Sequence, residues 1–223
     1  MSKHSAGERV AANSGIGRVL SVNVGQARPI ASKSGMSGID KRPVEGPVRV
    51  SAPGAKGSAG SGLAGDAVCD RANHGGDDQA VYAYAREDLD RWQGVLARTL
   101  APGSFGENLT TIGVDVTGAL VGERWRVGEH LVLSVTAPRL PCRTFAVWLE
   151  EQGWVKTFTK RAIPGTYLRV VEPGMVEAGD RIEVIDRPPH TVTIGVLFRA
   201  LTLEPHLRSR FVEATDYLPD DLL

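Results

Sequence analysis

Cysteine is scarce in this chain of 223 residues, which contains only two, Cys69 and Cys142, far apart in the sequence. There is no CxxC or HxH pair and no cluster of histidines and cysteines. Two thiols cannot build a zinc site or an iron–sulfur cluster unaided, so the cysteines alone support neither centre. Each thiol is therefore considered separately.

The chain also lacks net charge, because 26 lysines and arginines balance 26 aspartates and glutamates. A neutral chain gives no indication of nucleic acid or anionic lipid as a partner. The first fifteen residues are polar and small, unlike a signal peptide, and no later run approaches the roughly 18 apolar residues of a membrane span. We therefore expect a cytoplasmic protein without membrane or nucleic-acid partners, in which a disulfide is disfavoured.

Nucleotide-binding signatures are absent as well. No GxGxxG follows a predicted strand to open a helix, and no GxxxxGK[ST] occurs. No internal repeat with a period of about 20 to 50 residues is visible. A dinucleotide or nucleotide triphosphate site therefore has no support.

Short apolar runs separated by glycine and proline make up most of what is present. They predict strands over 17–25, at the end of 33–50, within 109–137 and within 167–198. Residues 51–66 are small and flexible in composition and predict a loop. Many short strands with frequent turn signals are typical of a β-barrel.

Helices are predicted in three places. Over 77–98, Asp77 or Asp78 can cap the helix and apolar residues recur at helical spacing. A second helix is predicted over 142–152 and a third from Ala200 to Thr215. Together with seven or more strands, these helices favour a mainly β fold with α structure (α+β), a β-barrel with helices packed outside.

The domain organisation follows from these elements. Residues 1–15 are predicted to be a disordered leader, residues 16–189 a barrel domain, and residues 190–223 a C-terminal extension with a strand and a short helical tail.

The sharpest local feature is APRLPCRTF, residues 137–145, in which two prolines stiffen the approach to Cys142. Arg139 and Arg143 flank the thiol and favour its thiolate, the form that binds soft metals and attacks electrophiles. If Cys142 starts the following helix, the helix dipole favours the thiolate further. A buried, inert cysteine at a strand-to-helix turn remains the alternative.

A second feature is the glycine-containing segment PGSFGENLTT, residues 102–111. Gly103 and Gly106 free the backbone for positive φ and for close approach to a ligand. Glu107 and Asn108 then lie on a tight loop with their polar groups available. A purely structural loop would have a similar sequence, so both interpretations stay open.

His74 lies in NHGGDDQAVYAY, before a Gly-Gly turn at the start of the predicted helix 77–98. This position suits a pocket, and equally a helix-capping network. Cys69, in DAVCDR, is predicted to lie on a strand and to serve packing, because its nearest cation is Arg71.

Basic residues that could bind a phosphate occur at two places in the sequence. Lys33, Lys41 and Arg42 belong to the early loop, and Lys160 and Arg161 precede IPGTY. Most such residues are solvated surface, which is the alternative interpretation.

Taken in order, these segments resemble the MOSC domain family, named from the C-terminal domain of molybdenum cofactor sulfurases, and within it the YiiM-like branch. The matching stretches are KSG, IDKRPVEGPVRV, GLAGD, NHGGDDQAVYAY, PGSFGENLTTIGVDV, VGERWRVGEHLVLSVTAPRLPCRTF and IPGTYLRVVEPGMVEAGDRIEV. They cover most of residues 16–187. The ordered series, with the cysteine in its PRxPC context, is more specific than any one stretch.

The resemblance implies a MOSC-type β-barrel, a molybdopterin-type molybdenum cofactor, and Cys142 as the thiolate ligand of the metal. Carried over by position, PRxPC gives Arg139, and the FGENL loop gives Glu107 and Asn108, as groups near cofactor or substrate. His74 is a further catalytic candidate.

The phosphate and pterin of such a cofactor need cationic partners. Lys33, Lys160 and Arg161 are the candidates for this role, beside Arg139 and Asn108.

The resemblance also implies an activity. Relatives of this kind remove oxygen from N-hydroxylated compounds such as 6-hydroxylaminopurine, so that N–OH becomes N–H and water is released. The cofactor supplies two electrons. Because this chain lacks cysteines for an iron–sulfur cluster and any recognisable flavin motif, we expect a separate flavin or iron–sulfur reductase as electron donor.

Other interpretations remain open. A non-catalytic protein could carry molybdenum cofactor, or sulfur as a persulfide on Cys142, for delivery elsewhere. Cys142 could instead be a nucleophile in group transfer, with His74 as its base if the fold brings them together. Pyridoxal phosphate is not expected, because no lysine has a context that argues for a Schiff base. The sequence leaves the oligomeric state open.

Overall fold

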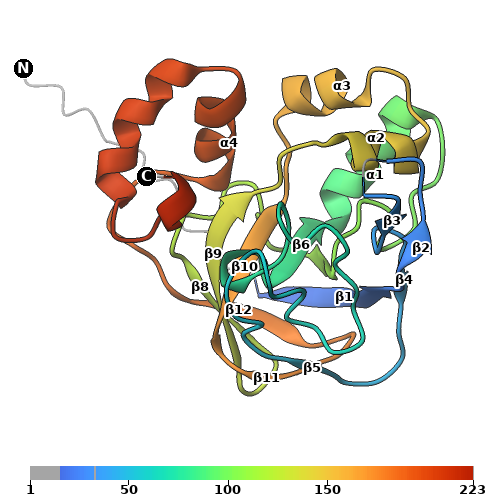
Figure 1. The fold of residues 1–223 in the computed structure, drawn as a ribbon. Coiled ribbons are helices and arrows are strands. Elements are labelled where there is room, and N and C mark those ends of the chain that lie inside the picture. Colours follow the sequence, from blue (N-terminus) through green and yellow to red (C-terminus); the bar gives the residue numbers. More distant parts are fainter. Residues whose placement is uncertain (1–15, 33, 223) are drawn as a thin grey trace, which may run out of the picture.

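A barrel of short strands forms the centre of the fold (Figure 1). The computed structural model describes residues 16–32 and 34–222, so the predicted leader and Lys33 lie outside the described residues. Within these residues seven strands close the barrel: β12 (Arg181–Asp186), β8 (Arg124–Val127), β9 (Leu131–Pro138), β10 (Thr166–Glu172), β6 (Val81–Ala85), β7 (Leu109–Ile112) and β1 (Gly17–Gly25).

The strands follow one another around the barrel in that order, and β1 pairs with β12 to close it through Gly17 and Ile182. Strands β6 and β7 run parallel, and the other neighbouring pairs run antiparallel. Four shorter strands and β4 complete the described β structure: β2 (Arg28–Pro29) with β3 (Met36–Ser37), β5 (Val48–Val50) with β11 (Gly174–Val176), and β4 (Lys41–Pro43) on β1.

The helices lie outside the barrel, in two groups (Figure 1). One group contains α1 (Arg86–Leu96), α2 (Arg143–Leu149) and α3 (Trp154–Arg161). The other contains α4 (Ile194–Thr202) and the 3-10 turns η2 (Pro205–Ala214) and η3 (Asp220–Leu222), while a further 3-10 turn, η1, spans Asp77–Gln79. The predicted α+β fold, a β-barrel with helices packed outside and a helical tail, is confirmed.

The molecule has two hydrophobic clusters of different composition. The barrel interior is mostly aliphatic, with residues such as Val19, Leu133 and Leu168. The second cluster, called the aromatic cluster below, lies between the barrel and the α1–α3 group. Its central rings lie 4.9 to 6.3 Å apart between centroids, and they belong to Trp92, Phe105, Phe145, Trp154 and Phe158.

Strand β6 separates these two clusters, and it corrects the predicted helix over 77–98. Only 86–96 is α-helical; 77–79 is a 3-10 turn and 81–85 is a strand. Val81, Ala83 and Ala85 belong to the barrel interior, whereas Tyr82 and Tyr84 belong to the aromatic cluster. The sequence VYAYA alternates with the period of a strand, but both faces are buried, which hid the period from a polarity pattern.

The predicted strand within HTVTIGVLF is also wrong, because Ile194–Thr202 is helix α4. The Thr193 hydroxyl caps it by accepting a 3.1 Å hydrogen bond from Val196 N. Ile194, Leu197 and Phe198 are fully buried at helical spacing, so tertiary burial selects the helix despite the β-branched residues. The predicted helical tail is right in kind, but it is 3-10 from Pro205 to Ala214.

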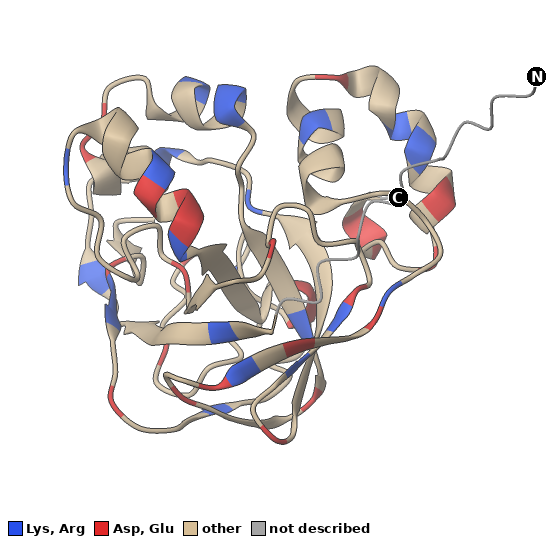
Figure 2. Cartoon of the chain, turned by 180° about the vertical axis from the view of Figure 1, so that it is seen from behind, with Lys and Arg blue, Asp and Glu red and all other residues tan. Residues whose placement is uncertain are grey.

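The surface reflects the balanced composition. On the face seen in Figure 2, lysines and arginines are interspersed with aspartates and glutamates rather than gathered by sign. None of the helices among the described residues has the length and apolar character of a membrane span.

Candidate functional site

A cavity open to solvent lies where the loops after β3 and β5 approach β6 and the start of α2. Its polar or aromatic lining side chains come from segments far apart in the sequence. They include Ser34, Ser37, Lys41, Asp66, Cys69, Asp70, His74, Tyr82, Asn108, Arg139, Cys142, Thr144 and Tyr167.

Cys142 reaches the cavity from the junction between β9 and α2. The residue is extended, with φ −126° and ψ 171°, and is the N-cap of α2, whose Ala146 N donates to Cys142 O at 3.1 Å. Its thiol is free and half-buried. The predicted strand-to-helix turn is therefore present, and the start of α2 presents its positive dipole end to the sulfur. The sulfur is therefore accessible from the cavity.

Arg139 lies beside it and has an unusual environment. The side chain is buried, with its guanidinium carbon 4.5 Å from the Phe145 ring centroid and 5.0 Å from that of Tyr82. Among the described residues Nε finds no hydrogen-bond partner and the guanidinium forms no ion pair. Burial alone would lower the pKa of Arg139, but its neighbours, including Tyr167 and Cys142, raise it overall.

A buried guanidinium without an ion pair is costly unless an anion compensates it. Glu107 and Cys142 favour the charged guanidinium from nearby, but neither is ion-paired with it, so it is available to a bound anionic ligand. The aromatic rings of Tyr82 and Phe145 fix the position of the Arg139 guanidinium, which is suited to bind an anionic group.

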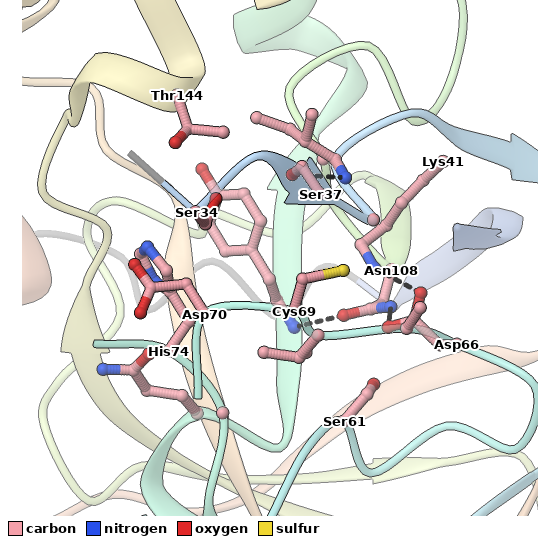
Figure 3. Close-up of a pocket in the computed structure, with 18 of the residues that line it drawn as sticks. Ser34, Ser37, Lys41, Ser61, Asp66, Cys69, Asp70, His74, Asn108 and Thr144 are labelled. Carbon is pink, nitrogen blue, oxygen red and sulfur yellow. Dashed lines mark hydrogen bonds and ion pairs between the residues drawn. The ribbon is translucent and has the colours of Figure 1, made fainter. Parts of the chain in front are cut away.

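Asp66 organises the opposite wall. One carboxylate oxygen accepts from Gly25 N at 2.8 Å and forms an ion pair with Lys41 Nζ, and the other accepts from Asn108 Nδ2 at 2.9 Å. The side chains of Lys41 and Asp66 are 8% and 1% exposed. Burial lowers the pKa of Lys41, although Asp66 opposes this shift. Figure 3 shows Lys41, Asp66 and Asn108 together on this wall, with Asp70 and His74 across the cavity.

Asn108 has a second role besides lining the cavity. Its Oδ1 accepts from Tyr82 N at 3.1 Å, and its Nδ2 also donates to Asn23 O at 3.3 Å. The side chain therefore links β6 to β1, and the same amide nitrogen donates the hydrogen bond to Asp66. The structure brings Asn108 to the site together with Arg139 and Cys142.

Glu107, by contrast, is turned into its own loop and does not line the cavity. Its fully buried carboxylate accepts from Gly103 N at 2.6 Å, Phe105 N at 3.0 Å and Thr110 Oγ1 at 2.8 Å. Burial raises the pKa of Glu107 against these hydrogen bonds. Its observed contacts shape the loop, which is the structural interpretation that the sequence left open.

Gly103 shows why this loop needs glycine. Its φ is +85°, and a Cβ there would lie 2.3 Å from Lys41 O. The close approach fixes β4, and with it Lys41, against the loop that carries Asn108.

His74 lines the cavity as a neutral side chain. Burial lowers its pKa to about 4, and the positive charge of Arg139 adds to the shift. At neutral pH the ring therefore offers a hydrogen-bond donor and an acceptor, but no positive charge.

Cys69 is not on a strand, contrary to the sequence interpretation. It lies half-buried in the loop between β5 and η1 and lines the same cavity as Cys142. The loop that contains Cys69 is rich in small residues and folds over the barrel. Cys69, which the sequence interpretation assigned to packing, therefore faces the site.

Lys160 and Arg161 are exposed in the last turn of α3 and are not brought to the cavity. The guanidinium carbon of Arg161 lies 5.3 Å from the Trp92 ring centroid, on the outside of the aromatic cluster. Lys33 lies outside the described residues.

Asp66, Tyr82 and Tyr167 are among the residues of the site that sequence reasoning missed. For Asp66 a signal was available, since it is a lone carboxylate directly after a long run of small residues, in GLAGD. The tyrosines carried no such signal, because strand pairing between β6 and β10 places them side by side, with ring centroids 5.1 Å apart.

Comparison with known proteins gives the family of the chain. The model of the MOSC domain family matches residues 70–183. YflK of Bacillus subtilis is 32% identical over 79% of this chain and 76% of its own length. The chain belongs to the MOSC domain family, as the sequence resemblance predicted, and this family is associated with the molybdenum cofactor.

Further relatives lie in the YiiM-like branch. YiiM of Escherichia coli is 30% identical over 56% of this chain and 57% of its own length. The crystal structure of YiiM from Geobacillus stearothermophilus superimposes with a TM-score of 0.73 over 92% of this chain and 95% of that chain, at 24% identity, and shows the same fold. A protein of Gibberella moniliformis named a reductase is 28% identical over 68% of this chain, which spans 26% of that protein.

Proposed function

We propose that this protein is an oxidoreductase that holds a molybdenum cofactor through Cys142 and reduces N-hydroxylated compounds, with 6-hydroxylaminopurine-like bases as the model substrate. It would work in the cytoplasm and receive electrons from a separate flavin or iron–sulfur reductase. The observation that carries the proposal is the pairing, in one cavity, of a free, accessible Cys142 thiol with a buried Arg139 that has no anionic partner among the described residues.

The residues present fit the cofactor. Cys142 offers a soft sulfur ligand at the start of a helix, and Arg139 offers a desolvated cation for an anionic group. Hydroxyls of Ser34, Ser37 and Thr144 line the same cavity and can donate to oxygen atoms. When bound, the molybdenum cofactor supplies the two electrons of the reaction.

The overall reaction is R–NH–OH + 2 e⁻ + 2 H⁺ → R–NH₂ + H₂O. The chain's own part is to bind and orient the substrate and to deliver protons. Tyr82 and Tyr167 give the cavity an aromatic wall, against which a planar base can stack. His74 is neutral at working pH, so it can donate and accept hydrogen bonds without adding a charge to the cavity.

The relatives support an oxidoreductase through the name of the fungal protein, in which a segment like this chain is about a quarter of a longer polypeptide. The alternative is a protein that carries the cofactor, or sulfur on Cys142, without turnover. It shares the same cavity and predicts metal binding without reduction of substrate.

The test is molybdenum content by elemental analysis of protein made in a host that synthesises the cofactor, followed by reduction of 6-hydroxylaminopurine with an artificial electron donor. Wild type is compared with Cys142→Ser and with Cys69→Ser, the matched thiol control from the same cavity. The proposal expects near-stoichiometric metal and turnover in wild type, both lost in Cys142→Ser and metal kept in Cys69→Ser.

Other results would decide against the reductase. Metal without turnover favours the carrier, and no metal in wild type contradicts both molybdenum functions. Equal metal in Cys142→Ser would remove Cys142 as the ligand.

A further inference from the structure

The reaction proposed above consumes two protons, so the cavity needs an acid that can release one. Which residue supplies that proton is a question that rests on the proposed function. Most ionisable groups of the lining are poor donors. Burial raises the pKa of Tyr82 and of Tyr167, and burial lowers that of His74 to about 4, which leaves it without a proton to give at neutral pH.

Lys41 differs from these groups in both position and charge. It lies on β4, where it pairs with Gly25 of β1, and its backbone carbonyl is held against Gly103. Its ammonium is ion-paired with Asp66, which is fixed in turn by Gly25 N and by Asn108. The ammonium therefore has one set position in the wall of the cavity, with little contact with solvent.

The charges facing Lys41 come from three other segments. Asp66 and Glu107 favour its protonated form, while Arg139 and burial favour loss of the proton. Because burial is the largest of these influences, Lys41 is a stronger acid than an exposed lysine. Asp66 remains as a hydrogen-bond acceptor for the neutral amine after the proton leaves.

We propose that Lys41 is a catalytic residue, the general acid that protonates the hydroxyl oxygen of the N-hydroxylated substrate. The N–O bond breaks, the oxygen leaves as water with the Lys41 proton, and the nitrogen keeps its bond to the substrate carbon. The two electrons come from the external reductase through the cofactor, and the second proton comes from solvent. Solvent at the open mouth of the cavity then restores the Lys41 ammonium.

Lys41→Arg separates this role from simple charge, because arginine keeps the positive charge but does not release a proton at working pH. The holoenzyme variant should keep its molybdenum and its KM within about twofold, while kcat falls by about 10²- to 10⁴-fold, the range for loss of a general acid. The fall of kcat at high pH, expected in wild type as Lys41 deprotonates, should disappear in the variant.

Chemical rescue gives a second readout. In Lys41→Ala, added primary amines should restore kcat in proportion to their concentration, with a slope that depends on the amine pKa. Lys156→Arg is the matched control, because Lys156 is exposed on α3 and away from the cavity. It should leave molybdenum content, kcat and the pH profile unchanged.

A measurement independent of turnover is the titration of Lys41 in cofactor-free protein, followed by NMR of ¹³Cε-labelled lysine. Its pKa should lie below that of an exposed lysine. A titration at or above the ordinary lysine range would overturn the proposal.

A kcat in Lys41→Arg equal to that of wild type would also overturn the proposal that Lys41 is the general acid. The side chain would then contribute only its positive charge. That result differs from failure of the proposed function, in which wild type itself binds no metal or reduces no substrate. In the latter case both proposals fail together.

Discussion

The two walls of the cavity differ in how their charges are satisfied. On one wall Lys41, Asp66 and Asn108 form a closed set of ion pair and hydrogen bonds. On the other, Arg139 is buried without an ionic partner among the described residues, beside the free thiol of Cys142. The paired wall fixes geometry, and the unpaired wall is arranged to receive an anion or a soft metal.

The largest effect on stability is expected from breaking the paired wall. Asp66→Ala leaves the Lys41 ammonium, Gly25 N–H and the Asn108 amide without their shared acceptor. Removing one partner of a buried pair costs about 3–5 kcal/mol, so the free energy of unfolding in urea should fall by this amount.

The double variant Lys41→Met, Asp66→Leu is the control, because it removes both charges at once. It should be more stable than Asp66→Ala. If the double variant were no more stable than Asp66→Ala, the loss of stability in Asp66→Ala would not come from leaving Lys41 unpaired.

A smaller effect is expected from pH, at the unpaired wall. The folded pKa of His74 is about 4, against 6.5 for the ordinary side chain. Between these values the unfolded chain binds a proton that the folded chain does not, so stability falls as pH drops from 6.5 to 4, by about 3 kcal/mol at most. In His74→Gln the free energy of unfolding, measured by urea unfolding at each pH, should depend less on pH across that range.

Asp88 supplies a comparison of opposite sign, away from the cavity. Burial raises its pKa to about 6 from 3.8. The stability that Asp88 contributes is present at low pH and is lost as pH rises through 6. Asp88→Asn should therefore remove a fall in the free energy of unfolding with rising pH, whereas His74→Gln removes a rise. If both variants changed the pH dependence in the same direction, the assignment of the two shifts would be wrong.

The smallest effect on stability is expected from Arg139→Met, because no ion pair within the described residues is broken. Replacing an unpaired buried charge with an apolar side chain should change the free energy of unfolding by less than about 1 kcal/mol, or raise it. Molybdenum content should nevertheless fall. A loss of stability as large as that of Asp66→Ala would contradict the distinction between the two walls.

The sequence predicted the barrel class, β1, the strands within 109–137, the helix after Cys142 and the α-helical part of 77–98. Strand β1 begins and ends at glycine, and Pro141 precedes the helix after Cys142, whereas the helix over 86–96 is flanked by alanines and was indicated by its helical period. It also placed Cys142, Arg139, Asn108 and His74 near one site, and all four line the cavity. Their roles remain predictions.

The errors have a shared physical origin. Strand β6 is buried on both faces and gives no alternation of polarity, and α4 is rich in β-branched residues but buried along one helical face. Glu107 was expected near cofactor or substrate, yet its carboxylate closes its own loop. For β6 and α4, burial by distant segments decided the outcome, because local propensity is too weak to oppose it. For Glu107, hydrogen bonds within its own loop decided it.

By itself, the sequence determined the local features: a cysteine held between prolines and arginines at the start of a helix, and a glycine-bounded loop that presents an asparagine. Only the tertiary structure decided that Lys41, Asp66 and Asn108 meet, since they come from three separate segments joined through β1. It likewise placed Cys69 and Cys142 in one cavity and left Arg139 without an ionic partner among the described residues. Barrel closure sets these contacts, because pairing in the sheet fixes which distant residues become neighbours.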